Sequence, residues 1–333
     1  MIDLREALNR WPQWSPSTDG VCRLPNDFLG PGFWVLFAAS ARAMGISSDN
    51  VQYPSENHHS YAKALGLPVL LDENAEPNIT RRTEGSQYAR LTHLKGAEAA
   101  NQATGRINSC VREILAGSPT RKQLASDLSF VIGELHDNVA AHTDAVGISM
   151  AQRLRQSRKH PAEIIFAIAD LGGGFSRKLR QYGIDHRDDA EAIEWCLTEG
   201  RSTAASGEPK DEWAQVLPDD AIGNPYPDSI ERAYNSANHH QGLGLATLVK
   251  RVKEYKGVLE IASGRILYSI QEDGLSQFET LEHGWAGVAI SCRFRQDAAG
   301  SGVELGVDSA ITTLRKRFRT GETNDISDQT SGD

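Results

Sequence analysis

Residues 124–143, LASDLSFVIGELHDNVAAHT, carry the clearest periodic pattern of the sequence. Its apolar residues recur at spacings of three and four, which predicts an amphipathic helix over residues 121–142. The polar residues Glu134, Asn138 and His142 follow one another at intervals of four. Each therefore lies only about 40° further around the helix axis, and together they form a polar row beside the apolar stripe. Such a row is expected to face a cleft at the edge of the core, although an ordinary helix with a solvated flank has the same pattern.

A second motif, Asp170-Leu-Gly-Gly-Gly-Phe175, directly follows the continuous apolar run of residues 164–169. A run of this length and composition predicts a strand that is buried on both faces. An aspartate at the end of such a strand is well placed to accept a hydrogen bond from an exocyclic amine. The consecutive glycines allow the backbone to turn sharply and to approach a ligand closely. The alternative interpretation of this motif is a flexible loop.

A third motif, Gln241-Gly242-Leu243-Gly244-Leu245, stands directly before a helix predicted over residues 243–255. Glycines at a helix start leave backbone N–H groups free, and the helix dipole adds positive potential, which together suit phosphate oxygens. The motif is not a Walker loop, because no Gly-Lys-Ser/Thr follows. It is not a dinucleotide-binding fingerprint either, because that fingerprint needs Gly-x-Gly-x-x-Gly in a βαβ unit.

In this order and at these separations, the three motifs resemble the ATP site of the GHKL superfamily, which includes gyrase, heat-shock chaperone, histidine kinase and MutL proteins. The N-box is Glu134-Leu-His-Asp-Asn138, the next box is Asp170-x-Gly172-x-Gly174, and the phosphate box is Gly242-x-Gly244-Leu245. The resemblance covers about residues 97–295. It implies an α+β Bergerat fold, an α/β sandwich with a mixed sheet and with helices on one face.

The resemblance also implies a role for each motif position and two ligands, ATP and Mg²⁺. Asn138 would coordinate the Mg²⁺ that bridges the phosphates, and Glu134 would orient or deprotonate the attacking water or hydroxyl. Asp170 would bind the adenine amino group, and residues 200–241 would form an ATP lid. The other positions expected to contact the nucleotide are His142, Gly172, Gly174, Gly242, Leu243, Gly244 and Leu245.

The sequence departs from the family pattern at specific positions. Histidine kinases usually carry a lysine where this chain has Ala141. The spacing from Asn138 to His142 is similar to that of anti-sigma-factor serine kinases, although Val139 replaces their alanine. Near the last strand the family often has Gly-Thr, whose hydroxyl supports adenine binding, and this chain has Gly287-Val288.

We expect three parts along the chain. Residues 1–96 are predicted to form a small α/β domain and a connector, either a STAS-like domain or a plain α/β cap. Residues 97–298 would be the GHKL domain, and residues 299–333 a short helix followed by a disordered acidic tail. Strands are predicted at 20–24, 51–53, 68–71, 164–169, 257–263, 267–270 and 288–294, and helices at 31–44, 58–65, 97–115, 121–142, 179–183, 190–199 and 243–255, while residues 76–96 connect or pair at a sheet edge.

Composition excludes several classes of protein. The formal net charge of −9 argues against broad binding to nucleic acids or anionic membranes, because both need a dominant basic surface. The four cysteines form no Cys-x-x-Cys pair, so we expect reduced, mostly buried thiols. No run of about 18 apolar residues and no signal-peptide pattern occurs, so we expect a cytoplasmic protein.

Three functions follow from the resemblance. The first is ATP hydrolysis that drives a lid-closing regulatory switch with a protein partner. The second is a serine/threonine protein kinase that acts on a STAS-type partner, which the Asn138 to His142 spacing favours. The third is a non-catalytic nucleotide sensor or scaffold in stress signalling or phage defence. In each case ATP and ADP are the expected ligands, and a homodimer is one option because many members of the superfamily dimerise.

Overall fold

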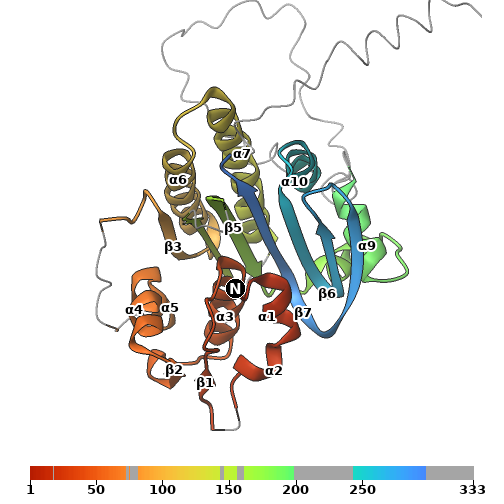
Figure 1. Ribbon diagram of the computed structural model, residues 1–333. Coiled ribbons are helices and arrows are strands. Elements are labelled where there is room, and N and C mark those ends of the chain that lie inside the picture. The colour runs from red at the N-terminus through yellow and green to blue at the C-terminus, as the bar shows by residue number, and fades with distance from the viewer. Residues whose placement is uncertain are drawn as a thin grey trace, which may run out of the picture. The chain divides into compact units, whose positions relative to one another are not determined.

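The computed structural model describes residues 1–17, 19–72, 75, 82–142, 146–155, 161–198 and 243–297 (Figure 1). These residues belong to a single unit that spans Met1–Gly300. Three predictions lie outside the described residues: the lid over residues 200–241, the phosphate contact of Gly242, and the helix and acidic tail over residues 299–333. Within the described part, no helix is both long enough and apolar enough to cross a lipid bilayer.

A five-stranded sheet forms the centre of the structure. The α+β class is confirmed, but the expected mixed sheet is wrong, because every pair of neighbouring strands is antiparallel. Short connections join β4 to β5 and β6 to β7, which suits antiparallel strands, whereas parallel strands need a long crossover. The pairs β3–β4 and β5–β7 are also antiparallel, although helices lie between their strands in the chain. In spatial order the strands are β3 (Tyr88–His93), β4 (Gly147–Leu154), β5 (Glu163–Asp170), β7 (Ser276–Arg295) and β6 (Val258–Ile270).

The predicted strand at residues 164–169 is confirmed as β5, and it is buried on both faces. Successive side chains on a strand point to opposite faces of the sheet. Phe166 and Ile168 therefore belong to the apolar cluster on one face, and Ala167 and Ala169 to the cluster on the other. The described helices of residues 97–298 all pack on the first face, as expected for that part of the chain, and helices of residues 1–71 cover the second face.

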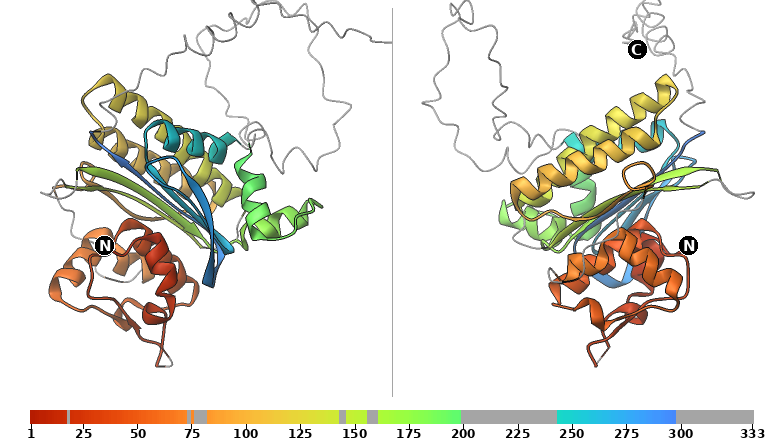
Figure 2. Two further views of the ribbon diagram at one scale, coloured as in Figure 1. Left: turned by 45° about the vertical axis from the view of Figure 1, so that its right-hand side comes forward. Right: turned by 90° about the vertical axis from the view of Figure 1, so that its left-hand side faces the viewer.

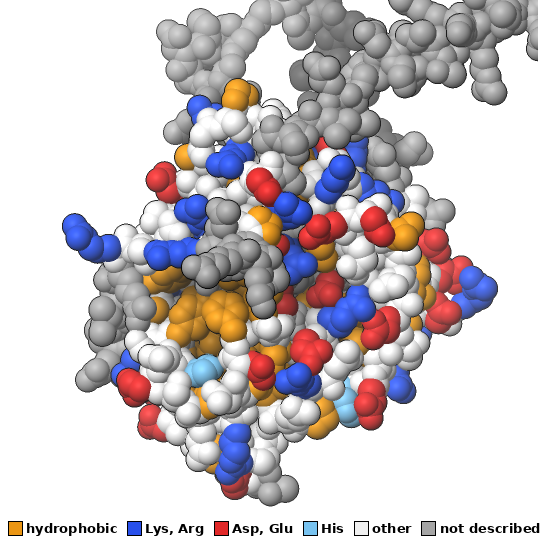
Figure 3. Space-filling view, in the orientation of Figure 1, with side chains coloured by type: hydrophobic (Ala, Val, Ile, Leu, Met, Phe, Trp, Pro, Cys, Tyr) orange, Lys and Arg blue, Asp and Glu red, His pale blue; other side chains and the backbone are white. Residues whose placement is uncertain are grey.

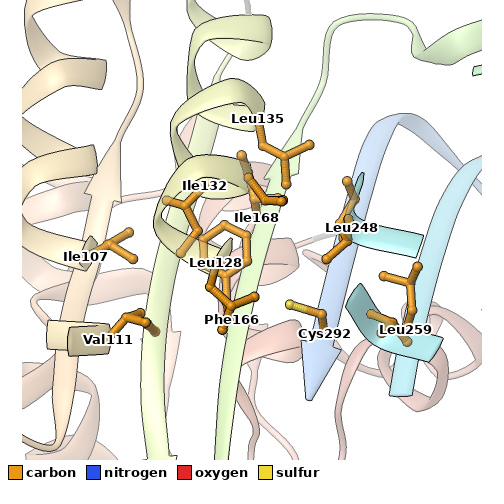
Figure 4. Close-up of a cluster of buried hydrophobic side chains, with 14 of the residues drawn as sticks. Ile107, Val111, Leu128, Ile132, Leu135, Phe166, Ile168, Leu248, Leu259 and Cys292 are labelled. Atoms are coloured by element: carbon orange, nitrogen blue, oxygen red, sulfur yellow. The ribbon is translucent and has the colours of Figure 1, made fainter. Parts of the chain in front are cut away.

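The first face is covered by α6 (Gly96–Ile114), α7 (Pro119–His142) and α10 (Leu243–Glu254). The helices α8 (Gly174–Gln181) and α9 (Asp189–Leu197) add side chains to the same cluster. In Figure 4, Leu128 and Leu135 of α7 point toward Phe166 and Ile168 of the sheet. The predicted helix at residues 121–142 is confirmed as α7. Its predicted apolar stripe is buried at every position: Leu124, Leu128, Val131, Leu135 and Val139.

Residues 1–71, the N-terminal segment, cover the opposite face of the sheet (Figure 2). This segment is mainly helical, and its only strands among the described residues are the two-residue pair β1 (Cys22–Arg23) and β2 (Val51–Gln52). The core of this segment is aromatic, with Trp34 and its neighbours packed ring against ring. Its helices are α1 (Leu4–Asn9), α2 (Trp11–Trp14), α3 (Pro31–Ala43), α4 (Glu56–Leu65) and α5 (Leu67–Leu71), with a 3-10 turn at Ser48–Asn50.

Residues 1–96 do not stand apart as a domain. β3 lies within this range and pairs with β4, so the expected boundary after residue 96 cuts through the central sheet. The strand expected at residues 68–71 is the helix α5, because a short apolar run fits either structure and the preceding Gly66, with φ of 83°, ends α4 and allows a second helix to begin. The STAS likeness suggested for this region stays a prediction.

Other elements differ from the expectations in extent. β6 is one strand where two were predicted, and β7 begins at Ser276, well before residue 288. α8 begins at Gly174, before the helix predicted from residue 179. All four cysteines are free, and all are buried except Cys196, which is half-buried, as predicted for reduced thiols.

Candidate functional site

The polar row of α7 lies at the border of the core. Glu134 and Asn138 are both half-buried, beside the fully packed stripe of the same helix. Among the described residues, the carboxamide of Asn138 has no hydrogen-bond partner. His142 is the last residue of α7, but its side chain lies outside the described part of the structure.

The first turn of α10 lies directly against this row. A Cβ atom placed on Gly244 would stand 2.8 Å from the Cβ of Glu134, which is closer than real Cβ atoms approach. Only glycine at this position therefore allows the start of α10 to approach Glu134. Leu245 packs partly buried against the core and so fixes the helix start in place. The backbone of Leu243 begins α10, while its side chain is outside the described part.

The end of β5 reaches the same region. Asp170 is the last residue of β5 and pairs with Gly147, the first residue of β4. Gly147 in turn lies so close under Val139 of α7 that a Cβ would collide with that side chain. Because Val139 directly follows Asn138, the end of α7 lies over the strand pair that carries Asp170. The structure therefore brings the polar row and Asp170 to one end of the sheet.

The carboxylate of Asp170 is buried, with 6% of the residue exposed. Burial raises its pKa from 3.8 to about 6, while hydrogen bonds from the backbone N–H groups of Gly172 and Val288 and the charge of Lys178 oppose that rise. The Gly172 N–H donates to Oδ1 at 2.7 Å. At neutral pH the carboxylate is ionised, and it is a strong acceptor because few water molecules compete for it.

The glycine turn after Asp170 depends on conformations that favour glycine. Gly173 and Gly174 have φ values of 89° and 74°, in the left-handed region. A Cβ on Gly174 would lie 2.6 Å from the Ser263 hydroxyl, and a Cβ on Gly287 would collide with the Asp170 carbonyl oxygen. The turn is thus pressed against the neighbouring strands β6 and β7 at backbone distance.

Three contacts hold the turn in this position. The N–H of Gly173 donates to the carbonyl of Ala286 at 2.8 Å, and the indole N–H of Trp285 donates to the Asp170 carbonyl at 2.8 Å. Ser263 of β6 accepts a hydrogen bond from the Phe175 N–H at 3.0 Å and so caps α8, which has no side-chain cap of its own.

The sequence did not single out Ser263, Trp285 or Lys178 as residues of this region. Ser263 and Trp285 reach the turn from β6 and β7, and no local pattern marks such a long-range contact, whereas Lys178 acts on Asp170 from α8, which begins in the turn itself. Gly287 was noted only because Val288 follows it where the resemblance leads one to expect threonine. Ser263 pairs with Val288 across β6 and β7, and its hydroxyl lies beside Gly174.

His136 lies within the N-box but faces the core. The residue is completely buried and hydrogen-bonds to Thr104 of α6 and Ser149 of β4. Burial lowers its pKa from 6.5 to about 3, so the ring is neutral at physiological pH. It therefore does not belong to the solvent-side row formed by Glu134 and Asn138.

The arrangement fits a magnesium ion that arrives with phosphate groups. Mg²⁺ prefers oxygen ligands and commonly takes only one or two from the protein, with phosphates and water supplying the rest. Asn138 offers one carboxamide oxygen, and Glu134 adds a carboxylate one helical turn away. Among the described residues no cluster of three or more His, Cys, Asp or Glu side chains could hold a metal alone.

The surface charge on the face shown in Figure 3 does not favour a ligand of one particular charge. On the face shown in Figure 3, acidic and basic side chains are interspersed, without a broad region of one sign. The chain has no significant match to any protein-family model, curated protein or solved structure.

Proposed function

We propose that this chain binds Mg²⁺-ATP at the site formed by α7, the glycine turn after β5 and the start of α10, and that it hydrolyses ATP to drive a regulatory switch. One observation carries the proposal: Glu134, Asp170 and Gly244 are far apart in sequence but belong to elements that meet at one end of the sheet. A solvated helix flank and an unrelated flexible loop would have no reason to meet in this way.

Each part of the site has a chemical task that suits it. The buried carboxylate of Asp170 accepts a hydrogen bond from the adenine amino group, and the glycine turn that follows, packed against β6 and β7, holds that carboxylate at the end of β5. The first turn of α10 offers N–H groups and the positive end of its dipole to phosphate oxygens. Asn138 supplies an oxygen to Mg²⁺, which neutralises phosphate charge during phosphoryl transfer.

Glu134 is the residue that we assign to the attacking water. It lies one helical turn before Asn138 and against the start of α10, so it faces the position expected for the terminal phosphate. A carboxylate in that place orients the water and accepts its proton, a contribution typically worth about a hundredfold or more in rate.

A mass-resolved ATP assay with and without Mg²⁺ tests the proposal. We expect Mg²⁺-dependent release of phosphate by the wild type, loss of binding in Asn138→Ala, and retained binding with turnover reduced about a hundredfold in Glu134→Ala. Gln123→Ala, an exposed change on the same helix, is the matched control and should behave as the wild type. Full turnover in Glu134→Ala would show that Glu134 has no part in catalysis.

The same assay separates the two alternatives drawn from the sequence. A serine/threonine kinase would transfer the phosphoryl group to a STAS-type partner, and the partner's mass would rise. A sensor or scaffold would bind ATP or ADP tightly without releasing phosphate. Sedimentation of the protein with and without ATP would show whether the nucleotide also promotes a homodimer.

A further inference from the structure

A buried chain of hydrogen bonds connects α6, α7 and β4. The Thr104 hydroxyl lies 2.8 Å from Nδ1 of His136, and Nε2 of His136 lies 2.8 Å from the Ser149 hydroxyl. Neither His136 nor Ser149 is exposed at all. Buried polar groups need partners, and here each member of the chain has one.

The direction of each hydrogen bond in this chain follows from its neighbours. A hydroxyl has a single proton, and that of Thr104 is donated to the Ala100 carbonyl at 2.8 Å. The Thr104 oxygen therefore accepts from His136, which places the ring proton on Nδ1. With that proton on Nδ1, Nε2 is the acceptor of the imidazole and receives the proton of the Ser149 hydroxyl, 2.8 Å away. The histidine is thus held in one tautomer and one orientation.

The position of His136 on α7 relates it to the proposed site. Each residue turns an α-helix by about 100°, so Glu134 and Asn138, two residues away on either side, both point about 160° away from His136. The direction that bisects the two side chains of the row is directly opposite to His136. Whatever fixes His136 against α6 and β4 therefore fixes the direction of the row.

We propose that His136 is a positioning residue, whose hydrogen bonds to Thr104 and Ser149 set the rotation of α7 and thereby aim Glu134 and Asn138 at the nucleotide and its metal. This inference rests on the proposed function. Apolar contacts between helices tolerate small rotations, whereas hydrogen bonds at both ends of a rigid ring do not. At the outer radius of a helix, a rotation of about 10° moves a side chain by about 1 Å. A displacement of that size at a reacting group can reduce a rate by about a hundredfold.

Two substitutions, Thr104→Val and Thr104→Ser, distinguish a positioning role of His136 from a purely structural one. Valine keeps the shape of threonine but removes the oxygen that accepts the Nδ1 proton. Serine keeps that oxygen but removes the methyl group, which faces Gly133 of α7. A merely structural role would lower the stability of the variants but leave the Kd of the folded protein unchanged in both.

Calorimetric titration with Mg²⁺-ATP, combined with thermal unfolding, tests the pair in the full-length protein. We expect Thr104→Val to raise the Kd about tenfold and Thr104→Ser to change it by less than about twofold, even where Thr104→Ser is the less stable of the two. Nitrogen-15 NMR of the wild-type histidines gives a second readout, in which His136 should carry its proton on Nδ1.

The outcomes distinguish this inference from the function on which it rests. If the wild type binds Mg²⁺-ATP but the two variants bind it equally well, the positioning role is wrong and the proposed function stands. A proton on Nε2 of His136 would also overturn the positioning role. If the wild type does not bind the nucleotide, the proposed function fails and the inference fails with it.

Discussion

The N-terminal face of the sheet and the site around Asp170 are packed by different means. Under the N-terminal helices, large rings such as Trp34 and Phe37 are buried against one another, which removes much apolar surface from water. Around Asp170, glycines bring backbone segments close together and enclose a carboxylate. Burying a charge opposes folding, and such groups cluster at functional sites. Burial of large rings therefore stabilises the N-terminal face, whereas the region around Asp170 is where we propose that the ligand binds.

Two buried aspartates show the same contrast at the level of single residues. Burial raises the pKa of both Asp3 and Asp170 to about 6. Asp3 accepts hydrogen bonds from the Gly32 N–H at 2.5 Å and the Ser291 hydroxyl at 3.4 Å, and so joins α1 to α3 and to β7. Asp170 ends a strand beside a glycine turn. Asp3 connects elements of the fold, whereas we propose that Asp170 binds a ligand.

The largest effect is expected from Gly287→Ala. The new Cβ would collide with the carbonyl oxygen of Asp170, and neither backbone can move away without breaking the sheet. We expect a loss of more than about 4 kcal/mol in the free energy of unfolding, measured by urea denaturation. The control is Gly105→Ala in α6, where a Cβ meets nothing within 4 Å and helix propensity should stabilise the protein by about 0.5–1 kcal/mol. Equal stabilities for the two variants would contradict the close approach.

Trp34→Ala tests the opposite face. Removing this completely buried ring leaves a cavity and an unpaired Leu29 carbonyl, so we expect the free energy of unfolding to fall by about 3–5 kcal/mol. At a temperature where the variant is folded, its Kd for Mg²⁺-ATP should equal that of the wild type. A weakened Kd in the folded variant would show that the two regions are not independent.

Asp170→Asn is expected to act through pH. The folded-state pKa of Asp170 is about 6 against a model value of 3.8, so the folded protein holds the proton more tightly than the unfolded chain. This contribution is fully present below pH 3.8 and is lost as pH rises through 6. The variant lacks it, so between about pH 4 and pH 7 its stability should improve relative to the wild type by about 3 kcal/mol.

Asp3→Asn is the matched control for that measurement. The pKa of Asp3 is raised in the same direction and by the same cause, so the pH dependence of its stability difference should have the same sign. Only Asp170→Asn should also lose nucleotide binding. If both variants bind ATP as the wild type does, the contrast between the two carboxylates is structural only.

The smallest effect is expected from Arg5→Gln. Arg5 forms ion pairs with Glu260 at 3.1 Å and with Glu279 at 2.7 Å, and its side chain is 28% exposed. Pairs of this kind contribute about 1 kcal/mol or less and weaken with salt. Denaturation at low and high salt should show a difference from the wild type that shrinks as salt rises, with no change in ATP binding. An undiminished difference at high salt would point to packing as its source.

Local patterns predicted the parts of the fold that depend on local spacing. The periodic stripe of α7, the apolar run of β5 and the glycines before α10 each specify an element without reference to distant residues. β4 was not predicted, because GISMAQRL mixes polar and apolar residues while every side chain from Gly147 to Gln152 is buried. Polar groups at such positions are accommodated only by distant partners, as Ser149 is by His136.

In the candidate site, too, local patterns predicted some residues but not their distant partners. Glu134, Asp170 and Gly244 were predicted from motifs, and the structure brings their elements together. Ser263 and Trp285 secure the glycine turn from other strands, and nothing in their sequence neighbourhood indicates this. The all-antiparallel sheet and the N-terminal helices on its second face likewise depend on pairings between segments that are distant in the chain.

Calorimetric titration of the wild type and of Asp170→Asn with ATP and ADP in magnesium buffer tests whether the site around Asp170 binds an adenine nucleotide. We expect saturable binding of both nucleotides to the wild type, with a Kd of roughly 1 μM to 1 mM, and loss of that binding in a folded Asp170→Asn. A wild type that takes up neither nucleotide, or a variant that binds both with unchanged affinity, would contradict it.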